Sequence, residues 1–227
     1  MADWQESRVI DKKVWNDELF SLTFDTELLP FKAGQFIKVG LDVDGERIER
    51  PYSLVNAPDE TPGEIYFNLV DEGPLTRELA NIEPGDSIWV TRDAHGFLVL
   101  EEVPQSQHLW MMATGTGLGP FLSMLKSGEA IERFEKIVLV HGVRYAGDLS
   151  YQEQIADISG KINGKLTYLP IISREKSQNA LHGRITHLIE SGELESKAGL
   201  QINSDESHVM LCVNINMIRD MISLLEP

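Results

Sequence analysis

The sequence feature that most constrains the fold is a change of hydrophobic pattern near residue 100. Before this point, short segments rich in β-branched and aromatic residues are separated by turn signals such as Asp44-Gly45 and Pro84-Gly85. After it, short apolar runs alternate with helical patterns. Short, evenly spaced strands are typical of an antiparallel barrel, whereas a strand–helix repeat is typical of a doubly wound parallel sheet. The chain is therefore predicted to form two domains of different classes.

The predicted N-terminal domain is an antiparallel β-barrel that covers residues 1–100. Its expected strands span residues 18–24, 35–41, 64–70 and 87–90, and one short helix is expected at residues 75–81. Residues 101–107 are polar and contain a proline, so they are interpreted as the linker. The C-terminal domain, residues 108–227, is predicted to be an α/β doubly wound parallel sheet. Its expected strands are 108–113, 136–140, 166–172 and 208–213, and its expected helices are 120–126, 151–158, 185–190 and 217–225.

Charge and cysteine content exclude several functions. The 227 residues carry a formal net charge of −16, which argues against nonspecific nucleic-acid binding and predicts long-range repulsion of an acidic protein partner. The single cysteine, Cys212, allows neither an intrachain disulfide nor an iron–sulfur cluster. Any one-electron acceptor is therefore expected to be a separate molecule. The six histidines show no metal-ligand spacing, and no metal site is predicted.

The sequence also bears on location. It contains no run of about eighteen apolar residues, so no membrane span is predicted. The start of the chain, Met1-Ala2-Asp3-Trp4, is acidic and lacks the apolar core of a signal peptide. A cytoplasmic location is expected by default.

The tetrapeptide Arg50-Pro51-Tyr52-Ser53 combines groups suited to a flat ligand that bears phosphate. Arg50 offers a planar fork of donors for a phosphate, Tyr52 a flat face for stacking, and Ser53 a small hydroxyl. Pro51 fixes the backbone between them. An edge strand with a solvated arginine and a core tyrosine would explain the same residues, so the tetrapeptide alone does not decide between a site and a structural strand.

A second group of candidates follows the strands of the predicted parallel sheet, where ligands bind at the carboxyl edge. A glycine-rich turn, residues 114–119, comes between the first strand and the first helix. It would let a phosphate approach the backbone, but a plain strand–helix turn would explain the same residues. Arg144 follows the second strand, Arg174 follows the third, and Arg184 begins the third helix. Three arginines at one edge favour a phosphate-rich ligand, and an arginine after the second strand indicates an extra phosphate on the adenosine.

Taken together, these motifs resemble the ferredoxin–NADP reductase superfamily and, more closely, its bacterial ferredoxin (flavodoxin)–NADP reductases. The resemblance runs to about Asp220 and is densest at residues 34–36, 50–56, 113–120, 139–151, 173–175 and 190–195. It implies an FAD-binding barrel and an NADP-binding α/β domain, and a monomer is expected. The implied reaction is hydride transfer between NADPH and FAD, coupled to single-electron transfer between FAD and a separate ferredoxin or flavodoxin.

The resemblance implies roles for candidates in the barrel. Arg50 would bind the FAD pyrophosphate, Tyr52 would lie against the isoalloxazine ring, and Ser53 would approach flavin N5 as a catalytic residue. Two further residues would line the flavin and four would close over the pyrophosphate. With Pro51, these complete the implied FAD site: Phe67, Leu69, Gly73, Pro74, Leu75 and Thr76.

In the second domain, the implied NADP site has a phosphate end and a nicotinamide end. Five residues would surround the adenosine phosphates: Arg144, Arg174 and Arg184, with Tyr145 and Glu175 beside them. Thr116 would touch the cofactor at the domain junction, and Cys212 would lie beside the nicotinamide as the second catalytic residue. Asn214 completes the implied cofactor contacts. Catalysis would then consist of holding nicotinamide C4 near flavin N5, without an acid–base pair.

Two departures from the family pattern bear on turnover. Family members have Cys-Gly after the last strand where this chain has Cys212-Val213, and the sequence stops at Pro227, before the aromatic tail that covers the flavin in close relatives. Weaker turnover and looser FAD retention are expected.

Two alternative functions stay open: an NAD(P)H-dependent reductase of free flavins or other small acceptors, and a catalytically weakened cofactor-binding protein. If an acidic carrier docks, a local basic patch that includes Arg77, Lys38 or Lys32 is expected to receive it.

Overall fold

The computed structural model describes residues 3–70 and 72–225. The residues Met1 and Ala2, used above to argue against a signal peptide, and the C-terminal Pro227 lie outside this range. The chain divides into two compact units. The first runs to Glu102 and also includes Gly119–Ser127, whereas the second contains Val103–Leu118 and the chain from Gly128 onward.

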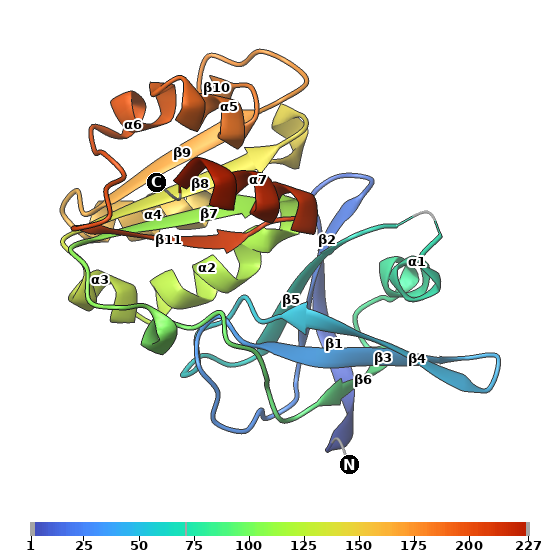
Figure 1. Cartoon of the computed structure of the whole chain (residues 1–227). Coiled ribbons are helices and arrows are strands. Elements are labelled where there is room, and N and C mark those ends of the chain that lie inside the picture. The colour runs from blue at the N-terminus through green and yellow to red at the C-terminus, as the bar shows by residue number, and fades with distance from the viewer. Residues whose placement is uncertain (1–2, 71, 226–227) are drawn as a thin grey trace. The chain divides into compact units, whose positions relative to one another are not determined.

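The first unit is built on a six-stranded sheet in which neighbouring strands pair antiparallel (Figure 1). Its strand order is β4-β3-β6-β1-β2-β5, with β1 Trp4–Val14, β2 Leu19–Phe24, β3 Phe36–Val43, β4 Glu46–Ser53, β5 Gly63–Asn68 and β6 Ser87–Thr91. An isolated bridge joins Leu54, the residue after β4, to Ile65 of β5, and β4 and β5 are the two outer strands of the sheet. The predicted antiparallel barrel architecture is confirmed.

Strand β1 is absent from the sequence-based prediction. Only Ser7 and Val9 of its eleven residues are buried, and most of the others are charged or polar, so it lacks the alternation that marks a strand. It becomes a strand because β2 and β6 both pair with it. A non-local partner, rather than its own pattern, decides its structure.

The core of the first unit comes from the inward residues of the predicted strands. Leu22, Phe24, Ile37 and Val39 are fully buried in one cluster. Helix α1 (Pro74–Asn81) adds Leu75 and Leu79 to the same cluster. Residues at the first turn of α1 are therefore held by core packing, which matters because that turn belongs to a predicted site.

The second unit is built on a five-stranded parallel sheet in the order β10-β9-β8-β7-β11. Its strands are β7 His108–Thr114, β8 Lys136–Val143, β9 Leu166–Ile172, β10 Leu181–His182 and β11 Ser207–Cys212. Its α-helices are α3 Glu129–Arg133, α4 Gln152–Lys161, α5 Ile185–Glu190, α6 Glu193–Ala198 and α7 Ile215–Leu225. The predicted doubly wound α/β architecture is confirmed. The helix expected at residues 120–126 also forms, but its residues group with the first unit.

Short 3-10 turns connect several elements. They are η1 Leu100–Glu102, η2 Gly115–Gly117 and η3 Ala146–Asp148, and η2 leads directly into helix α2 (Leu118–Lys126). Sequence patterns miss α3, α6 and the two-residue β10. Helix α6 is short and polar, and it lies between Gly192 and Gly199, which both have left-handed backbone conformations. A short polar segment between two glycines is typical of a loop, so the sequence does not predict this helix.

None of the helices in residues 3–70 and 72–225 combines the length and apolar composition needed to cross a bilayer.

Candidate cofactor sites

The tetrapeptide Arg50-Pro51-Tyr52-Ser53 ends strand β4, at the edge of the barrel sheet. Pro51 pairs with Lys38 of β3, and an edge strand tolerates the missing N–H of a proline. Arg50 is exposed, and its Nη1 donates to its neighbour's carbonyl, Glu49 O, at 2.7 Å. No described carboxylate pairs with the Arg50 guanidinium, so the side chain is available to a phosphate.

Tyr52 is half-buried against the barrel core. Its ring meets the Phe67 ring edge-on at 6.0 Å between centroids, and Phe67 stacks in turn on Phe20 at 5.7 Å. Burial raises the pKa of Tyr52 to about 12, against an opposing effect of Arg50, so the phenol is neutral at physiological pH. Phe67 is only 2% exposed, which places it behind Tyr52, whereas Leu69 is partly exposed.

The start of helix α1 forms a compact turn. Gly73 is the N-cap residue, and Pro74 occupies the first turn, where its missing N–H costs nothing. The Thr76 hydroxyl accepts from the Val70 N–H at 3.1 Å and donates to Gly73 O at 3.2 Å. A Cβ on Gly73 would lie 2.8 Å from Thr76 Oγ1, so the turn fits glycine. With no acid in its first turn, this helix N-terminus suits an anion.

In the second unit, parallel pairing brings the ends of five strands to one edge of the sheet. Arg144 directly follows β8, Arg174 comes two residues after β9, and Arg184 two residues after β10. The Arg174 N–H donates to Arg144 O at 3.0 Å. All three side chains are exposed, and none pairs with a carboxylate among the described residues, although the chain has 36 acidic side chains.

Tyr145 and Glu175 join the loops that carry these arginines. Arg174 Nη1 lies 3.5 Å from the Tyr145 hydroxyl, which raises the pKa of the Arg174 guanidinium further. The Ala146 N–H donates to the Glu175 carboxylate at 2.5 Å, and the Tyr145 N–H donates to Asp148 at 2.9 Å. Glu175 therefore holds the loop after β8 in place against the loop after β9.

The glycine-rich turn lies between β7 and α2. Gly115 has a φ of +52°, and a Cβ there would meet nothing within 4 Å. A Cβ on Gly117 would lie 2.1 Å from the Cys212 carbonyl oxygen, so only glycine permits the end of β11 to approach the turn. Thr116, between the two glycines, is partly exposed. Burial raises the pKa of the Cys212 thiol to about 11, which keeps it protonated.

Asn214 and Ser53, two predicted cofactor contacts, differ in their hydrogen bonding. Asn214 Oδ1 accepts from the Met217 N–H at 3.0 Å, so the side chain caps the N-terminus of α7. The cap alone explains why an asparagine stands at position 214. The contact between Asn214 and the cofactor stays a prediction. The Ser53 hydroxyl, by contrast, is half-buried and donates to no group that the structure describes.

His141 belongs to this edge of the sheet although its sequence context gives no signal for it. The sequence supports only a structural or solvated histidine. In the structure the ring is fully buried in β8, with Nε2 3.0 Å from Gly115 O and Nδ1 3.4 Å from the Tyr168 hydroxyl. The buried ring thus contacts the backbone of the glycine-rich turn at Gly115.

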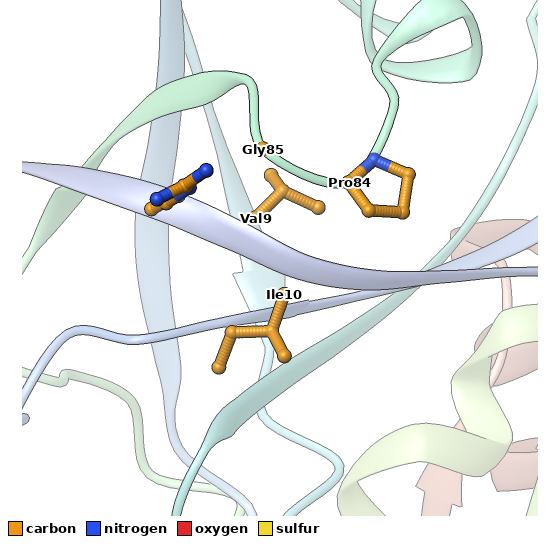
Figure 2. Close-up of a pocket in the computed structure, with 5 residues that line it drawn as sticks. Val9, Ile10, Pro84 and Gly85 are labelled. Atoms are coloured by element: carbon orange, nitrogen blue, oxygen red, sulfur yellow. The ribbon is translucent and has the colours of Figure 1, made fainter.

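A shallow depression of about 390 Å³ lies elsewhere on the barrel (Figure 2). It is lined by Arg8, Val9, Ile10, Pro84 and Gly85, where the register of β1 against β2 shifts between Val9 and Asp11. None of the predicted site residues lines it. We assign it no function.

Both halves of the chain match known families. A family model of an oxidoreductase FAD-binding domain matches residues 8–93, and one of an oxidoreductase NAD-binding domain matches residues 111–222. A crystal structure of a ferredoxin NADP+ reductase from Neisseria gonorrhoeae, with bound FAD and NADP, aligns with a TM-score of 0.93 at 29% identity. It covers 99% of this chain and 91% of that chain.

Curated relatives carry the same family name. The chain is 50% identical over 220 residues to a flavodoxin/ferredoxin–NADP reductase of Escherichia coli strain K12, across 97% of this chain and 89% of the relative. It is 37% identical over 235 residues to a ferredoxin–NADP reductase of Azotobacter vinelandii, across 100% of this chain and 90% of the relative. The chain therefore belongs to the flavodoxin/ferredoxin–NADP reductase family of FAD- and NADP-binding oxidoreductases.

Proposed function

We propose that the protein takes a hydride from NADPH onto bound FAD and passes the electrons singly to a separate ferredoxin or flavodoxin. The observation that carries the proposal is the edge of the parallel sheet, where Arg144, Arg174 and Arg184 lie exposed and pair with no carboxylate of residues 3–70 and 72–225. In a chain of net charge −16, such a group of unpaired cations is suited to a phosphate-rich ligand.

The arginines would select NADPH through its extra phosphate. A backbone hydrogen bond of 3.0 Å, from the Arg174 N–H to Arg144 O, holds the backbones of these two residues next to each other. Guanidinium groups bind phosphate through charge-assisted hydrogen bonds, which are among the stronger polar contacts. Glu175 would act indirectly, because its carboxylate already accepts from the Ala146 N–H.

The residues of the first unit fit FAD. Arg50 and the N-terminus of α1 offer a cation and a helix dipole for a pyrophosphate, and Tyr52 offers a neutral, rigidly backed ring for the isoalloxazine. Ser53 follows on the same strand, with a hydroxyl that is half-buried. When bound, FAD supplies the step from two-electron to one-electron chemistry.

The chain's own residues would position rather than exchange protons. The Cys212 thiol and the Tyr52 phenol both have raised pKa values, about 11 and about 12, and stay protonated at neutral pH. Neither is suited to general acid–base work at that pH. Holding the two reacting rings at the right distance is the contribution that the site is built to make.

A carrier would dock on the basic patch of the barrel that the sequence predicts. Lys32 pairs with Glu101 at 2.8 Å and Lys38 with Glu49 at 2.6 Å, so the basic patch proposed from the sequence is partly neutralised. Arg77 has no carboxylate partner among the described residues and is its remaining free cation. The monomeric state and cytoplasmic location expected from the sequence stay predictions.

The test compares two nucleotides in steady-state reduction of a dye. Replacing Arg144 and Arg174 together by alanine should raise the KM for NADPH by at least about tenfold and leave the KM for NADH nearly unchanged. Arg8→Ala is the matched control, since Arg8 is also exposed but lies outside both proposed sites. Equal losses with both nucleotides would show that these arginines do not read the extra phosphate.

A further inference from the structure

His141 links the glycine-rich turn to the sheet beneath it. It lies in β8, the central strand of the parallel sheet, and its ring is fully buried. Nε2 is 3.0 Å from Gly115 O, and Nδ1 is 3.4 Å from the hydroxyl of Tyr168, which lies in β9. Both ring nitrogens therefore have polar partners inside the second unit.

These partners fix the tautomer of the ring. A carbonyl oxygen only accepts, so Nε2 must carry the hydrogen, and Nδ1 then accepts from the Tyr168 hydroxyl. Burial lowers the pKa of His141 to about 4, although the Gly115 hydrogen bond and Asp148 oppose this shift. The ring is neutral at physiological pH. The hydrogen bonds thus run in one direction, from Tyr168 through His141 to Gly115.

Gly115 has no side chain that would restrict its own backbone conformation. Its φ is +52°, and the space where a Cβ would lie is open. Glycine permits both orientations of the following peptide, so hydrogen bonds must select one. Gly115 O accepts from His141 and from the Leu118 N–H, which begins the helical turn.

The orientation of one peptide follows from its planarity. In a trans peptide the carbonyl of Gly115 and the N–H of Thr116 point in opposite directions. Because the carbonyl is directed at the buried His141 ring, the Thr116 N–H is directed away from that ring. The opposite orientation would turn a carbonyl oxygen, a repulsive group for phosphate, to that side.

We propose that His141 is a positioning residue for NADP(H), which holds the Gly115–Thr116 peptide so that the Thr116 N–H faces the bound dinucleotide. The inference rests on the proposed function and deepens it. Tyr168 acts one step further away, because its hydroxyl keeps the hydrogen of His141 on Nε2. The role of the pair is to fix a backbone donor before the ligand arrives.

The test separates the two ends of the dinucleotide. Adenosine 2′,5′-bisphosphate and NADP+ are titrated by calorimetry into the FAD-loaded parent and into His141→Leu, which removes the donor, and His141→Gln, which retains one. We expect His141→Leu to bind the bisphosphate within about twofold of the parent and NADP+ about tenfold more weakly. His141→Gln should restore NADP+ binding to within about threefold, which a purely space-filling role would not produce.

Several outcomes would overturn the inference. These are parent-like NADP+ binding by His141→Leu, equal weakening of both ligands, or no recovery in His141→Gln. Each leaves the proposed function intact, because the parent's own binding of NADP+ tests that function separately. Should His141→Leu not fold, Tyr168→Phe decides: NADP+ binding weaker by about threefold with unchanged bisphosphate binding is expected, and unchanged NADP+ binding refutes the inference.

Discussion

Replacing Gly117 by alanine tests whether the contact between the glycine-rich turn and the end of β11 sets the nicotinamide position. The added Cβ would lie 2.1 Å from the Cys212 carbonyl oxygen and 3.1 Å from its carbonyl carbon and Sγ. Ordinary non-bonded carbon contacts lie at about 3.5–4.0 Å, so Cys212 and the turn must separate by about 1 Å or more. The clash is with backbone, and no rotamer change relieves it.

The expected loss of rate follows from that displacement. A misplacement of about 1 Å at a reacting group costs roughly a hundredfold in rate. We therefore expect Gly117→Ala to reduce bound flavin with NADPH about a hundredfold more slowly in an anaerobic stopped-flow experiment. Overpacking should also cost about 1–3 kcal/mol of unfolding free energy, measured by thermal or urea unfolding.

Gly199→Ala separates lost stability from lost positioning. Gly199 ends helix α6 with a φ of +65°, has open space at its Cβ position and belongs to neither proposed site. Alanine there should cost about 1–2 kcal/mol of stability and leave flavin reduction unchanged. A Gly117→Ala protein that reduces flavin as fast as the parent would refute the reasoning, since the contact would then have no bearing on the reacting end of NADPH.

Four further predictions follow from the two sites. Acid should release FAD and not FMN, because Arg50 and the α1 N-terminus suit a pyrophosphate, and thin-layer separation showing FMN would contradict this assignment. Val213→Gly should speed flavin reduction and leave NADPH affinity nearly unchanged, since it removes branched carbon beside the proposed nicotinamide position; an unchanged stopped-flow rate would contradict it. Electron transfer to an acidic carrier should slow as salt screens Arg77, whereas a rate that rises steadily with salt would indicate repulsion by the whole surface. Flavin reduction should be flat between about pH 6 and 8, because the pKa values of Cys212 and Tyr52, about 11 and about 12, keep both groups protonated there; an inflection lost in Cys212→Ser would contradict this.

The sequence predicts the architecture because most elements carry their own pattern. Strands β7 and β8 are apolar runs that are buried along nearly their whole length, as the centre of a parallel sheet requires, and β9 is apolar at its buried positions. Strand β1 and helix α6 are polar, and each depends on neighbours or on flanking left-handed glycines that local periodicity does not register. Patterns therefore identify the elements that are largely apolar and miss polar elements whose structure depends on non-local partners or on flanking glycines.

The candidate sites divide in the same way. The three arginines are predictable, because each lies within two residues of the end of a strand, and parallel pairing brings these strand ends to one edge. The hydrogen-bond partners are not predictable, because they depend on side-chain contacts between distant segments. Examples are the bond from the Ala146 N–H to Glu175 and that from His141 to Gly115 O, whose partners are 29 and 26 positions apart in the sequence.

The ion pairs of the surface also cannot be predicted from the sequence. Lys38 and Glu49 are on paired strands, and Lys32 and Glu101 come from segments far apart in the chain. Counting basic residues near the barrel overstates the free positive charge, because each pair cancels a cation that a carrier would otherwise meet. A docking patch thus needs the three-dimensional partners, not only the composition.

The most direct test of the central claim is an anaerobic double-mixing experiment with the FAD-loaded protein. NADPH is mixed first, and bleaching of the flavin band is followed in time; oxidised flavodoxin or ferredoxin is mixed second, and return of the band is followed. We expect rapid bleaching with NADPH, much slower bleaching with NADH, and recovery of the band on addition of the carrier. Bleaching at equal rates with both nucleotides, or a reduced flavin that the carrier does not reoxidise, would contradict the account.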